Sequence, residues 1–597
     1  MTKQTTKTFR LHTLAEGLKM QKNYMAAGIF DYIIIGAGSA GCVLAKRLGE
    51  ESSLKILVLE AGGDDNSIFV SMPTALSIPM NSKRFNWGMS TEPEPGLNGR
   101  VMNLPRGKGI GGSSSINGMC YVRGNPIDYE LWSALGATGW HWSNVLPYFQ
   151  RAENVNGGGA LRGKKGPLKV TRGSERNPLY HAFINAGGQA GYALSSNMNQ
   201  RQHEGFGPME MTVGNGKRCS TAVAYLRPAQ KKGNVTVLNK ALVERVVFED
   251  KRAVGVRFQK AGKYYQALVS KEIILSAGAI MSPVILKRSG IGPVLELLDL
   301  QIPIVKDAPQ VGENLMDHLE IYLQQQCKQP VSLYNSMNPL SKAWIGARWL
   351  INRSGLGATN HFESGAHIRS KAGVVYPDIQ FHFLPLAISY DGKSMANTHG
   401  YQVHVGTKRA HSRGWVRLRD NDPHSLPKVC FNYLTDERDW QDMRTCIGLT
   451  REIFSQAAFD PFRAQELAPG KQCQSDAQID EFIKQNVESA YHPCGTCRMG
   501  SDEQAVVDPE CKVQGVTGLR VVDASIMPQA TAGDLNAPTI MLAERAADMI
   551  LGKTLMCIED APILGDENWQ NCQRSNDIKY NYANDRENLK QAILASR

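Results

Sequence analysis

Three stretches of the chain have clear patterns of hydrophobic and polar positions. Residues 30–48, FDYIIIGAGSAGCVLAKRL, begin with continuous apolar residues (Tyr32 to Ile35), turn through glycines and continue with helix formers to Leu48. KILVLE is a second apolar strand, which ends at Glu60. PDIQFHFLP, residues 377–385, alternates instead, so one face takes Ile379, Phe381 and Phe383 and the other Gln380, His382 and Leu384. We interpret His382 as a hydrogen-bonded histidine of that sheet, with a place in a pocket as the alternative.

The first stretch has the order of a dinucleotide-binding unit. Gly36, Gly38 and Gly41 let the backbone pass close to a pyrophosphate, and the amides and positive dipole end of the following helix face the anion. Glu60, 24 residues after Gly36, is placed to accept hydrogen bonds from ribose hydroxyls, with an ordinary surface carboxylate as the alternative. This pattern predicts a Rossmann-like nucleotide site and leaves FAD and NAD open.

A run of small residues marks a second feature of the nucleotide end. In RGKGIGGSSSINGMCY, Arg106 to Tyr121, five small residues from Gly111 to Ser115 leave room for a bulky group. The run leads into an apolar stretch and does not continue as a polar linker, so we expect its backbone to pack against a flat ring system. A flexible loop is the alternative.

Composition adds limits. The 597 residues are 42% apolar, which predicts two domains, and glycines break every apolar run short of the roughly 20 residues of a membrane span. Twelve scattered cysteines indicate a reducing compartment. The net charge of +11 comes from dispersed residues, which excludes a nucleic-acid partner and favours weak attraction to an anionic membrane surface.

The two ends of the chain differ from its body. Residues 1–29 are basic and rich in hydroxyl groups but lack the apolar core of a secretory signal. We interpret them as an extension without a targeting role; the alternatives are an organelle transit peptide, or a start at Met20 or Met25. Residues 556–597 are polar, which predicts a surface tail.

From Asp31 to about Leu551 the chain resembles the glucose-methanol-choline (GMC) oxidoreductase family. The motifs that carry the resemblance are the glycine turn at Gly36, GKGIGGSSSINGMCYVRG, GAIMSPVILKRSGIG, and the pair YHPCGTCRMG and GLRVVDASIMPQATAGDLNAPTIMLAERAAD. The resemblance implies an α/β fold of two domains. An FAD-binding domain (30–165, 210–330 and 490–555) would carry an inserted substrate domain built on an antiparallel sheet (166–209 and 331–489).

The family's catalytic positions fall on His492 and Asn536. By resemblance, His492 takes the hydroxyl proton while flavin N5 takes the hydride, and Asn536 hydrogen-bonds the substrate oxygen. A core histidine and a helix N-cap asparagine are the alternatives. The residues implied to bind FAD are Gly36, Ala37, Gly38, Ser39, Ala40, Gly41, Glu60, Ala61, Trp87, Arg106, Gly107, Gly111, Gly112, Ser113, Asn117, Gly118, Met119, Val243, Asp523, Ala524, Asn536, Pro538 and Thr539.

Resemblance to the choline-oxidising members of the family implies the substrate. GLGATNHFESGAHIRS places Glu363 and Phe362 near a trimethylammonium head, with Trp87 and Tyr491 as further aromatic neighbours. A solvated loop glutamate is the alternative for Glu363. Members that attach FAD covalently have a histidine where this chain has Ile116, before Asn117, so FAD is expected to bind without a covalent link.

The implied reaction is oxidation of choline to betaine aldehyde, and on to glycine betaine in some members, with osmoprotection as its physiology. Resemblance favours a respiratory quinone as acceptor and peripheral contact with the cytoplasmic face of a bacterial inner membrane, or a mitochondrial location if residues 1–29 are a transit peptide. The rival readings are a family member acting on aliphatic or aromatic alcohols, a flavin-containing lyase, and a zinc hydrolase. The zinc reading rests on the HxE of His361 and Glu363 and on Cys494 and Cys497, about 130 residues away, farther apart than that site normally allows.

Overall fold

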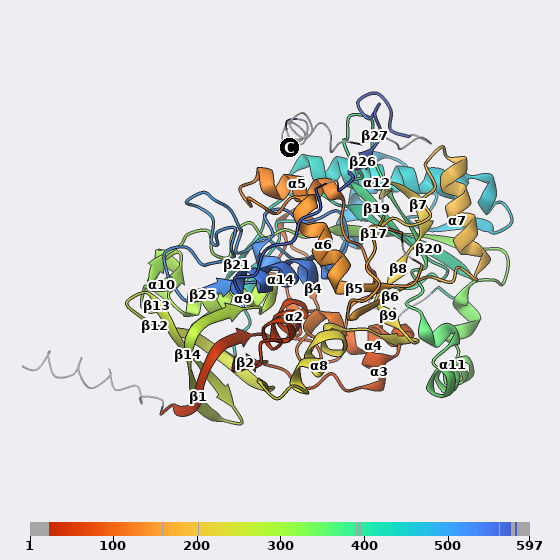
Figure 1. Ribbon diagram of the computed structural model, residues 1–597. Coiled ribbons are helices and arrows are strands. Elements are labelled where there is room, and N and C mark those ends of the chain that lie inside the picture. The colour runs from red at the N-terminus through yellow and green to blue at the C-terminus, as the bar shows by residue number, and fades with distance from the viewer. Residues whose placement is uncertain are drawn as a thin grey trace, which may run out of the picture.

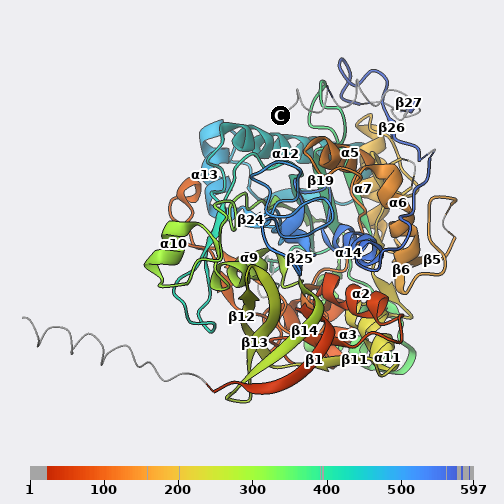
Figure 2. The same cartoon turned by 60° about the vertical axis from the view of Figure 1, so that its left-hand side comes forward.

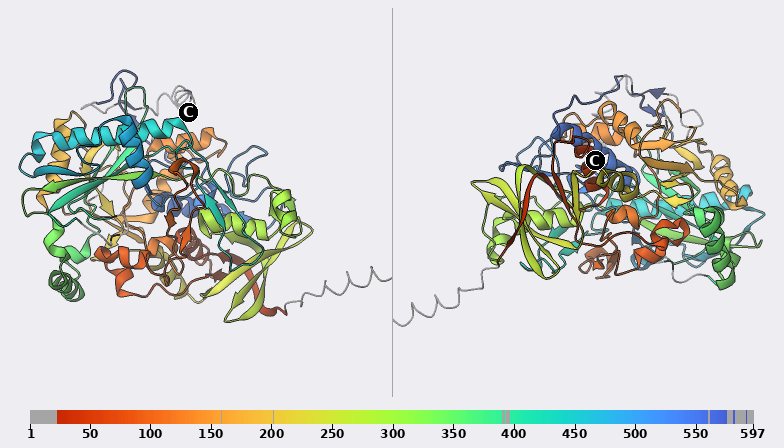
Figure 3. Two further views of the ribbon diagram at one scale, coloured as in Figure 1. Left: turned by 180° about the vertical axis from the view of Figure 1, so that it is seen from behind. Right: turned by 60° about the horizontal axis from the view of Figure 1, so that its bottom comes forward.

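Two seven-stranded sheets organise the part of the chain that this computed structural model describes, which is residues 23–157, 159–200, 202–389, 392, 396–559, 561–574, 580, 581 and 591. Figure 1 shows the first sheet at the lower left and the second beneath α12 at the upper right. Figure 2 and the rear view in Figure 3 show the same division.

The first sheet contains the predicted nucleotide-binding unit, and its strands run in mixed directions. Its order is β11 (Val235–Leu238), β2 (Ile56–Leu59), β1 (Met25–Ile35), β14 (Lys263–Leu275), β13 (Arg252–Lys260) and β12 (Ala241–Glu249), with β25 (Leu519–Val521) also paired to β14. The strands from β11 to β14, and β25, are parallel, whereas β13 and β12 are antiparallel. Ile33, near the carboxyl end of β1, lies between Leu57 and Ile273 and is fully buried, because helices cover this part of the sheet.

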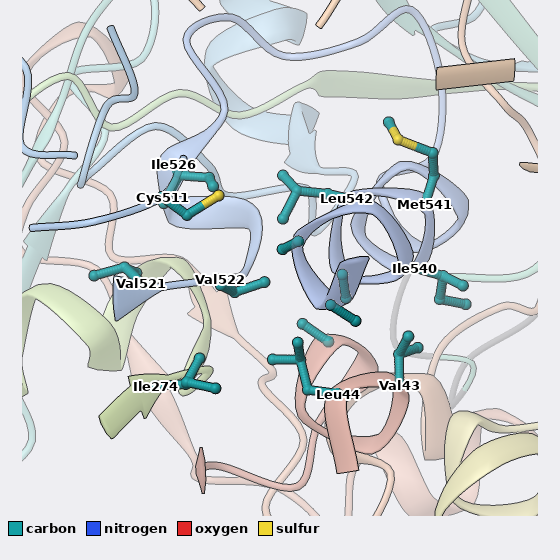
Figure 4. Close-up of a cluster of buried hydrophobic side chains, with 14 of the residues drawn as sticks. Val43, Leu44, Ile274, Cys511, Val521, Val522, Ile526, Ile540, Met541 and Leu542 are labelled. Atoms are coloured by element: carbon teal, nitrogen blue, oxygen red, sulfur yellow. The ribbon is translucent and has the colours of Figure 1, made fainter. Parts of the chain in front are cut away.

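Two helices far apart in sequence pack on each other above that sheet. They are α2 (Ser39–Leu48) and α14 (Asn536–Ile550). Figure 4 shows Val43 and Leu44 of α2 in the same buried cluster as Ile540 of α14, with Leu542 on the side of α14 away from α2. The end of the chain thus returns to the glycine turn near its beginning.

The second sheet is antiparallel throughout. Its order is β23 (Arg463–Ala468), β17 (Leu319–Cys327), β20 (Gly400–Thr407), β19 (Ile379–Leu384), β18 (Ser364–Ile368) and β7 (Gly205–Pro208), with β24 (Glu488–Ser489) also on β17. The predicted alternation of β19 is confirmed. Phe383 stacks on Phe183 of α7 (Pro178–Gln189), with ring centroids 4.9 Å apart, while His382 lies on the opposite face.

The remaining elements connect and cover these sheets. The helices are α3 (Ile68–Ser71), α4 (Ser77–Met80), α5 (Pro126–Ala134), α6 (Trp142–Ala152), α8 (Arg227–Gln230), α9 (Gly278–Arg288), α10 (Val294–Asp299), α11 (Pro339–Asn352), α12 (Glu437–Ser455) and α13 (Asp476–Asn486). The short strands are β3 (Met89–Ser90), β4 (Asn103–Leu104), β5 (Glu153–Val155), β6 (Leu168–Arg172), β8 (Glu210–Met211), β9 (Val213–Gly214), β10 (Lys217–Arg218), β15 (Ile291–Gly292), β16 (Lys306–Asp307), β21 (Trp415–Arg417), β22 (Lys428–Cys430), β26 (Leu564–Gly565) and β27 (Tyr580–Asn581). Among the described residues, no helix combines the length and the apolar character needed to cross a membrane.

The structure differs from the sequence prediction at three boundaries. β1 begins at Met25, inside the predicted extension, because residues 25–30 pair with β14 beyond the apolar run. β17, within the range predicted for the FAD-binding domain, belongs to the second sheet. In the predicted tail, Ala561 and Ile563 are fully buried and Asp566 bonds Arg369 at 2.7 Å, so residues 561–574 are packed chain. Residues 1–22, 575–579, 582–590 and 592–597 lie outside the described part.

Candidate active site

A cavity of about 1080 Å³ lies between the two sheets. Its nucleotide side includes the carboxyl ends of β1 and β2, at Ile35 and Leu59, which is where open sheets of this kind bind ligands. Its other side is the polar face of the second sheet, including Glu320, Tyr322 and His382. The cavity therefore joins the predicted nucleotide site to the predicted substrate domain.

The glycine turn fits an anion at the start of α2. Gly36 has a φ of +102°, and a Cβ there would lie 2.4 Å from the backbone oxygen of Ser276, so the close approach requires glycine. Gly38 is the N-cap of α2 and supplies no side-chain hydrogen bond to the first turn. Backbone amides at such a helix start bind phosphate well.

The run of small residues packs against that turn. A Cβ on Gly112 would lie 2.7 Å from Cα of Gly38. Gly112 is therefore small because two backbone segments meet there. The predicted space for a ring system is a second reason for small residues in this run. Gly112 and Ser113 also line the cavity, beside Asn117 and Gly118.

Glu60 lines the cavity, and its carboxylate also fastens the glycine turn. One oxygen accepts the amide of Ala37 at 2.9 Å and the other the amide of Gly62 at 2.7 Å. Burial raises the pKa of Glu60, although these hydrogen bonds oppose the rise. A carboxylate has about four acceptor sites, so Glu60 can still accept a ribose hydroxyl beside its backbone hydrogen bonds.

Most of the residues implied to hold FAD meet at this cavity. Those that line it are Gly36, Gly38, Ser39, Ala40, Glu60, Ala61, Trp87, Arg106, Gly107, Gly112, Ser113, Asn117, Gly118, Met119, Val243, Asp523, Ala524, Asn536 and Thr539. Ala37, Gly41, Gly111 and Pro538 are not part of the lining. Gly41 packs against the glycine turn itself, because a Cβ there would lie 1.9 Å from the backbone oxygen of Gly36. The uncapped helix start, the glycine backbone and Glu60 together fit the predicted FAD.

His492 and Asn536 both line the cavity, but the helix N-cap interpretation of Asn536 is wrong. The N-cap of α14 is Leu535, and Asn536 is the first residue of the helix. Ser39 Oγ donates to Asn536 Oδ1 at 2.8 Å. Since this bond occupies the amide oxygen, the NH₂ group is the donor that Asn536 can offer to a ligand.

Buried polar groups hold His492 from several sides. Its backbone amide donates to Asp317 Oδ1 at 2.7 Å, and its Nδ1 lies 3.1 Å from Nδ1 of His318. Burial, together with the His492 imidazole, lowers the pKa of His318 well below its usual value, so His318 is neutral. The preceding Tyr491 has a φ of +63°, a strained conformation of the kind found at functional sites. With Nδ1 engaged by His318, Nε2 is the nitrogen available for proton transfer.

Asp534 lies between two histidines of the cavity. Its oxygens are 3.4 Å from Nε2 of His492 and 3.5 Å from Nε2 of His382. Burial alone would raise the pKa of Asp534, but the adjacent imidazoles of His382 and His492 outweigh it and hold the pKa well below its usual range. His382 thus lines the cavity and is also hydrogen-bonded within the sheet, to Gln380 at 2.8 Å.

Glu320 is a second ionised carboxylate in the cavity. Its Oε1 lies 3.5 Å from Nδ1 of His404, and its side chain is 12% exposed. Burial would raise the pKa of Glu320, but the hydrogen bond with His404 outweighs it and lowers the pKa. Tyr322 stacks on His404 at 3.6 Å, and Phe362 meets the same ring edge-on at 5.1 Å. The group presents a negative charge among aromatic rings.

Glu363 requires a correction, because the structure does not bring it to the cavity. Its carboxylate accepts hydrogen bonds from Thr359 Oγ1 at 2.7 Å, the amide of Glu175 at 2.6 Å and Ser174 Oγ at 3.1 Å. Phe362, Trp87 and Tyr491, the other residues predicted for substrate binding, all line the cavity.

Sequence reasoning missed Glu320, Asp534, His318 and His404. The signal for Glu320 was present in MDHLEIYLQQQ, where Leu319, Ile321 and Leu323 alternate with His318, Glu320 and Tyr322. Asp534 lies two residues before Asn536 and has no pattern that singles it out.

The zinc reading gains no support. His361 bonds Thr74 Oγ1 at 2.8 Å, and Cys494 and Cys497 are fully buried. The described residues contain one His, Cys and carboxylate group with metal-like spacing, Cys120, His382 and Asp534, and it shares no residue with that reading.

Comparisons with known proteins agree with the geometry. The family models of GMC oxidoreductases match residues 30–320 and 410–543. An oxygen-dependent choline dehydrogenase of Brucella anthropi is 53% identical over 543 residues, covering 90% of this chain and 99% of the relative. One of Vibrio vulnificus is 51% identical over 551 residues, covering 92% and 98%. Pyridoxine 4-oxidase from Mesorbium loti, a solved structure, is 30% identical with a TM-score of 0.80, covering 88% and 100%. The chain belongs to the GMC oxidoreductase family.

Proposed function

We propose that this protein is an FAD-dependent enzyme that oxidises choline to betaine aldehyde. The observation that carries the proposal is one cavity with two different ends: Glu320 among aromatic rings, and His492 beside Asn536. The relatives at 53% and 51% identity, which carry the name oxygen-dependent choline dehydrogenase, support the same substrate. When bound, FAD supplies the acceptor for the hydride of the alcohol carbon.

The alcohol end of the cavity performs proton transfer. In the tautomer that we propose for His492, Nδ1–H donates to Nδ1 of neutral His318, 3.1 Å away, which leaves Nε2 to accept the hydroxyl proton. Asp534, 3.4 Å from that nitrogen, stabilises the imidazolium that forms. The NH₂ group of Asn536 donates to the substrate oxygen as negative charge develops there.

The cation end takes the trimethylammonium head. A quaternary ammonium ion has no N–H to donate, so a carboxylate and aromatic faces are the groups that offset its lost hydration. Glu320 with Tyr322 and Phe362 supplies both kinds of group, and it takes the role that the sequence suggested for Glu363.

FAD is held without a covalent link. The position that carries a histidine in covalent members is Ile116, which is 3% exposed and packs with Val70 and Phe85. An isoleucine offers no nucleophile to the flavin. Acid precipitation of the protein should therefore release all flavin into the supernatant, and flavin retained in the pellet would contradict this assignment.

The acceptor and the setting of the reaction belong to the same proposal. Electrons pass to a respiratory quinone at the cytoplasmic face of the membrane, the protein is peripherally bound there, and the product serves osmoprotection. The hydrated aldehyde is a second substrate and gives glycine betaine. Because the relatives are named oxygen-dependent, molecular oxygen must be compared directly with a quinone.

An anaerobic mixing experiment tests the proposal. The purified flavoprotein is mixed with choline or with a panel of neutral aliphatic and aromatic alcohols, and oxygen or a quinone analogue is then admitted. We expect choline to bleach the flavin far faster than the neutral alcohols. Faster bleaching by a neutral alcohol would instead assign the cavity to that substrate class, and the rate of colour return identifies the acceptor.

A further inference from the structure

The helix α11 exposes an apolar stripe to solvent. Leu340, Trp344 and Ile351 are 84%, 70% and 79% exposed. At 3.6 residues per turn these three positions lie within about 40° of one another around the helix. Trp349, on the opposite side, is 1% exposed and donates its indole N–H to the backbone oxygen of Gly216 at 2.6 Å. The helix thus has one apolar face bound to the protein and a second that the described chain leaves uncovered.

The exposed stripe adjoins the mouth of the cavity. All the solvent-exposed residues that line the cavity lie within 68–81 or 342–356, which include α3, α4 and part of α11. Five of them are apolar: Ile68, Phe69, Ile78, Leu350 and Leu356. Figures 1 and 2 show α3 beside α11, and Trp349 packs there against Met72 and Ala75.

The charge of this face selects an anionic partner. Residues 66–91 and 330–362 contain no aspartate or glutamate. They contain Lys83, Arg84, Lys342, Arg348 and Arg353. A helix with exposed Trp and Leu and with basic flanks is the composition that lies in the interface of anionic membranes.

We propose that α11, α3 and α4 form the surface on which this protein binds an anionic phospholipid bilayer, with the cavity mouth facing the lipid. The inference rests on the membrane contact in the proposed function and names the surface that makes it. A second copy of this chain would also cover apolar side chains, but two such basic faces would repel each other. The bilayer is therefore the occupant that matches both the exposed Trp344 stripe and the charge.

Vesicle sedimentation of the holoenzyme tests this surface. We expect the protein to sediment with vesicles of phosphatidylglycerol and phosphatidylcholine, to bind pure phosphatidylcholine more weakly, and to be released by salt. The triple variant Leu340→Ser, Trp344→Ser, Ile351→Ser should lose at least about a hundredfold in affinity, because three large apolar side chains no longer enter the lipid. Lys83→Gln with Arg348→Gln should lose roughly 25-fold, at about fivefold per charge.

The matched control is Leu295→Ser with Leu298→Ser. These residues are 78% and 57% exposed on α10, which both Figure 1 and Figure 2 place at the other end of the molecule from α11. This control should bind vesicles like the wild type. Bound flavin, circular dichroism and choline-dependent reduction of a soluble dye should be unchanged in the triple variant, since its three positions do not line the cavity.

Three outcomes would overturn the inference. In the first, the wild-type protein does not bind anionic vesicles. In the second, the triple variant binds them as tightly as the wild type. In the third, the only change in the triple variant is the loss of a dimer in light scattering. Vesicle binding is measured without substrate, so a failure of the choline assignment would appear only in the dye assay.

Discussion

The substitution Glu320→Gln separates recognition of the cation from the chemistry of the alcohol. It removes one charge while keeping the size of the side chain and an oxygen near His404. A cation about 4–5 Å from the carboxylate is attracted by about 3–4 kcal/mol at an effective dielectric constant near 20. The side chain is 12% exposed, so water replaces part of this attraction when the charge is lost. We therefore expect a net loss of about 2–3 kcal/mol, or roughly 30- to 150-fold in kcat/KM for choline.

The assay compares choline with 3,3-dimethylbutan-1-ol, which has the same shape without the charge. Wild-type enzyme should prefer choline, and Glu320→Gln should lose that preference while its turnover of the neutral alcohol changes little. Glu363→Gln is the matched control, because its carboxylate is engaged by Thr359, Ser174 and the amide of Glu175. The reasoning would be refuted if Glu320→Gln slowed both substrates equally, or if Glu363→Gln alone abolished the preference.

Three further predictions concern charge in and around the cavity. Asp534→Asn should slow anaerobic flavin reduction by choline roughly ten- to a hundredfold with FAD content unchanged, because the imidazolium of His492 loses its carboxylate; an unchanged rate in stopped-flow would contradict this role. Glu363→Gln should lower the midpoint of thermal unfolding and leave KM for choline unchanged, because a buried carboxylate with three hydrogen bonds is lost; calorimetry and steady-state kinetics decide, and the reverse pattern would restore Glu363 to the substrate site. The folded-state pKa of Glu320 is depressed, so its charge is fully present above the ordinary value of 4.5 and is lost only as pH falls through the lower value. Titration of Glu320 should therefore not raise KM for choline between pH 7 and 5. The prediction is contradicted if KM rises over this range for choline but not for 3,3-dimethylbutan-1-ol.

The nucleotide half of the fold was predictable because local sequence encodes it. A buried parallel strand reads as a continuous apolar run, and the turn at Gly36 needs glycine where a Cβ would meet Ser276. The same holds for β19, whose alternation alone assigns Phe383 to the core and His382 to the polar face. His492 and Asn536 were predicted from the motifs that resemble the family, and both side chains line the same cavity.

The substrate half was less predictable because its residues meet only in three dimensions. Glu320 and His404 lie on neighbouring antiparallel strands, and their pairing depends on a register that no local pattern fixes. The prediction for Glu363 was wrong for a related reason. Glu363 directly precedes β18, and the orientation of that strand decides whether its side chain faces the cavity or the loop at 173–175. The composition of the segment does not reveal that orientation.

The most direct test of the central claim is anaerobic mixing of the flavoprotein with choline that carries deuterium on the hydroxyl-bearing carbon. Hydride removal from that carbon predicts that unlabelled choline bleaches the flavin and yields betaine aldehyde. The deuterated substrate should bleach it more slowly, and His492→Ala should bleach very little while keeping its FAD. A flavin that choline does not reduce, or a rate that neither deuterium nor His492→Ala affects, would contradict the account.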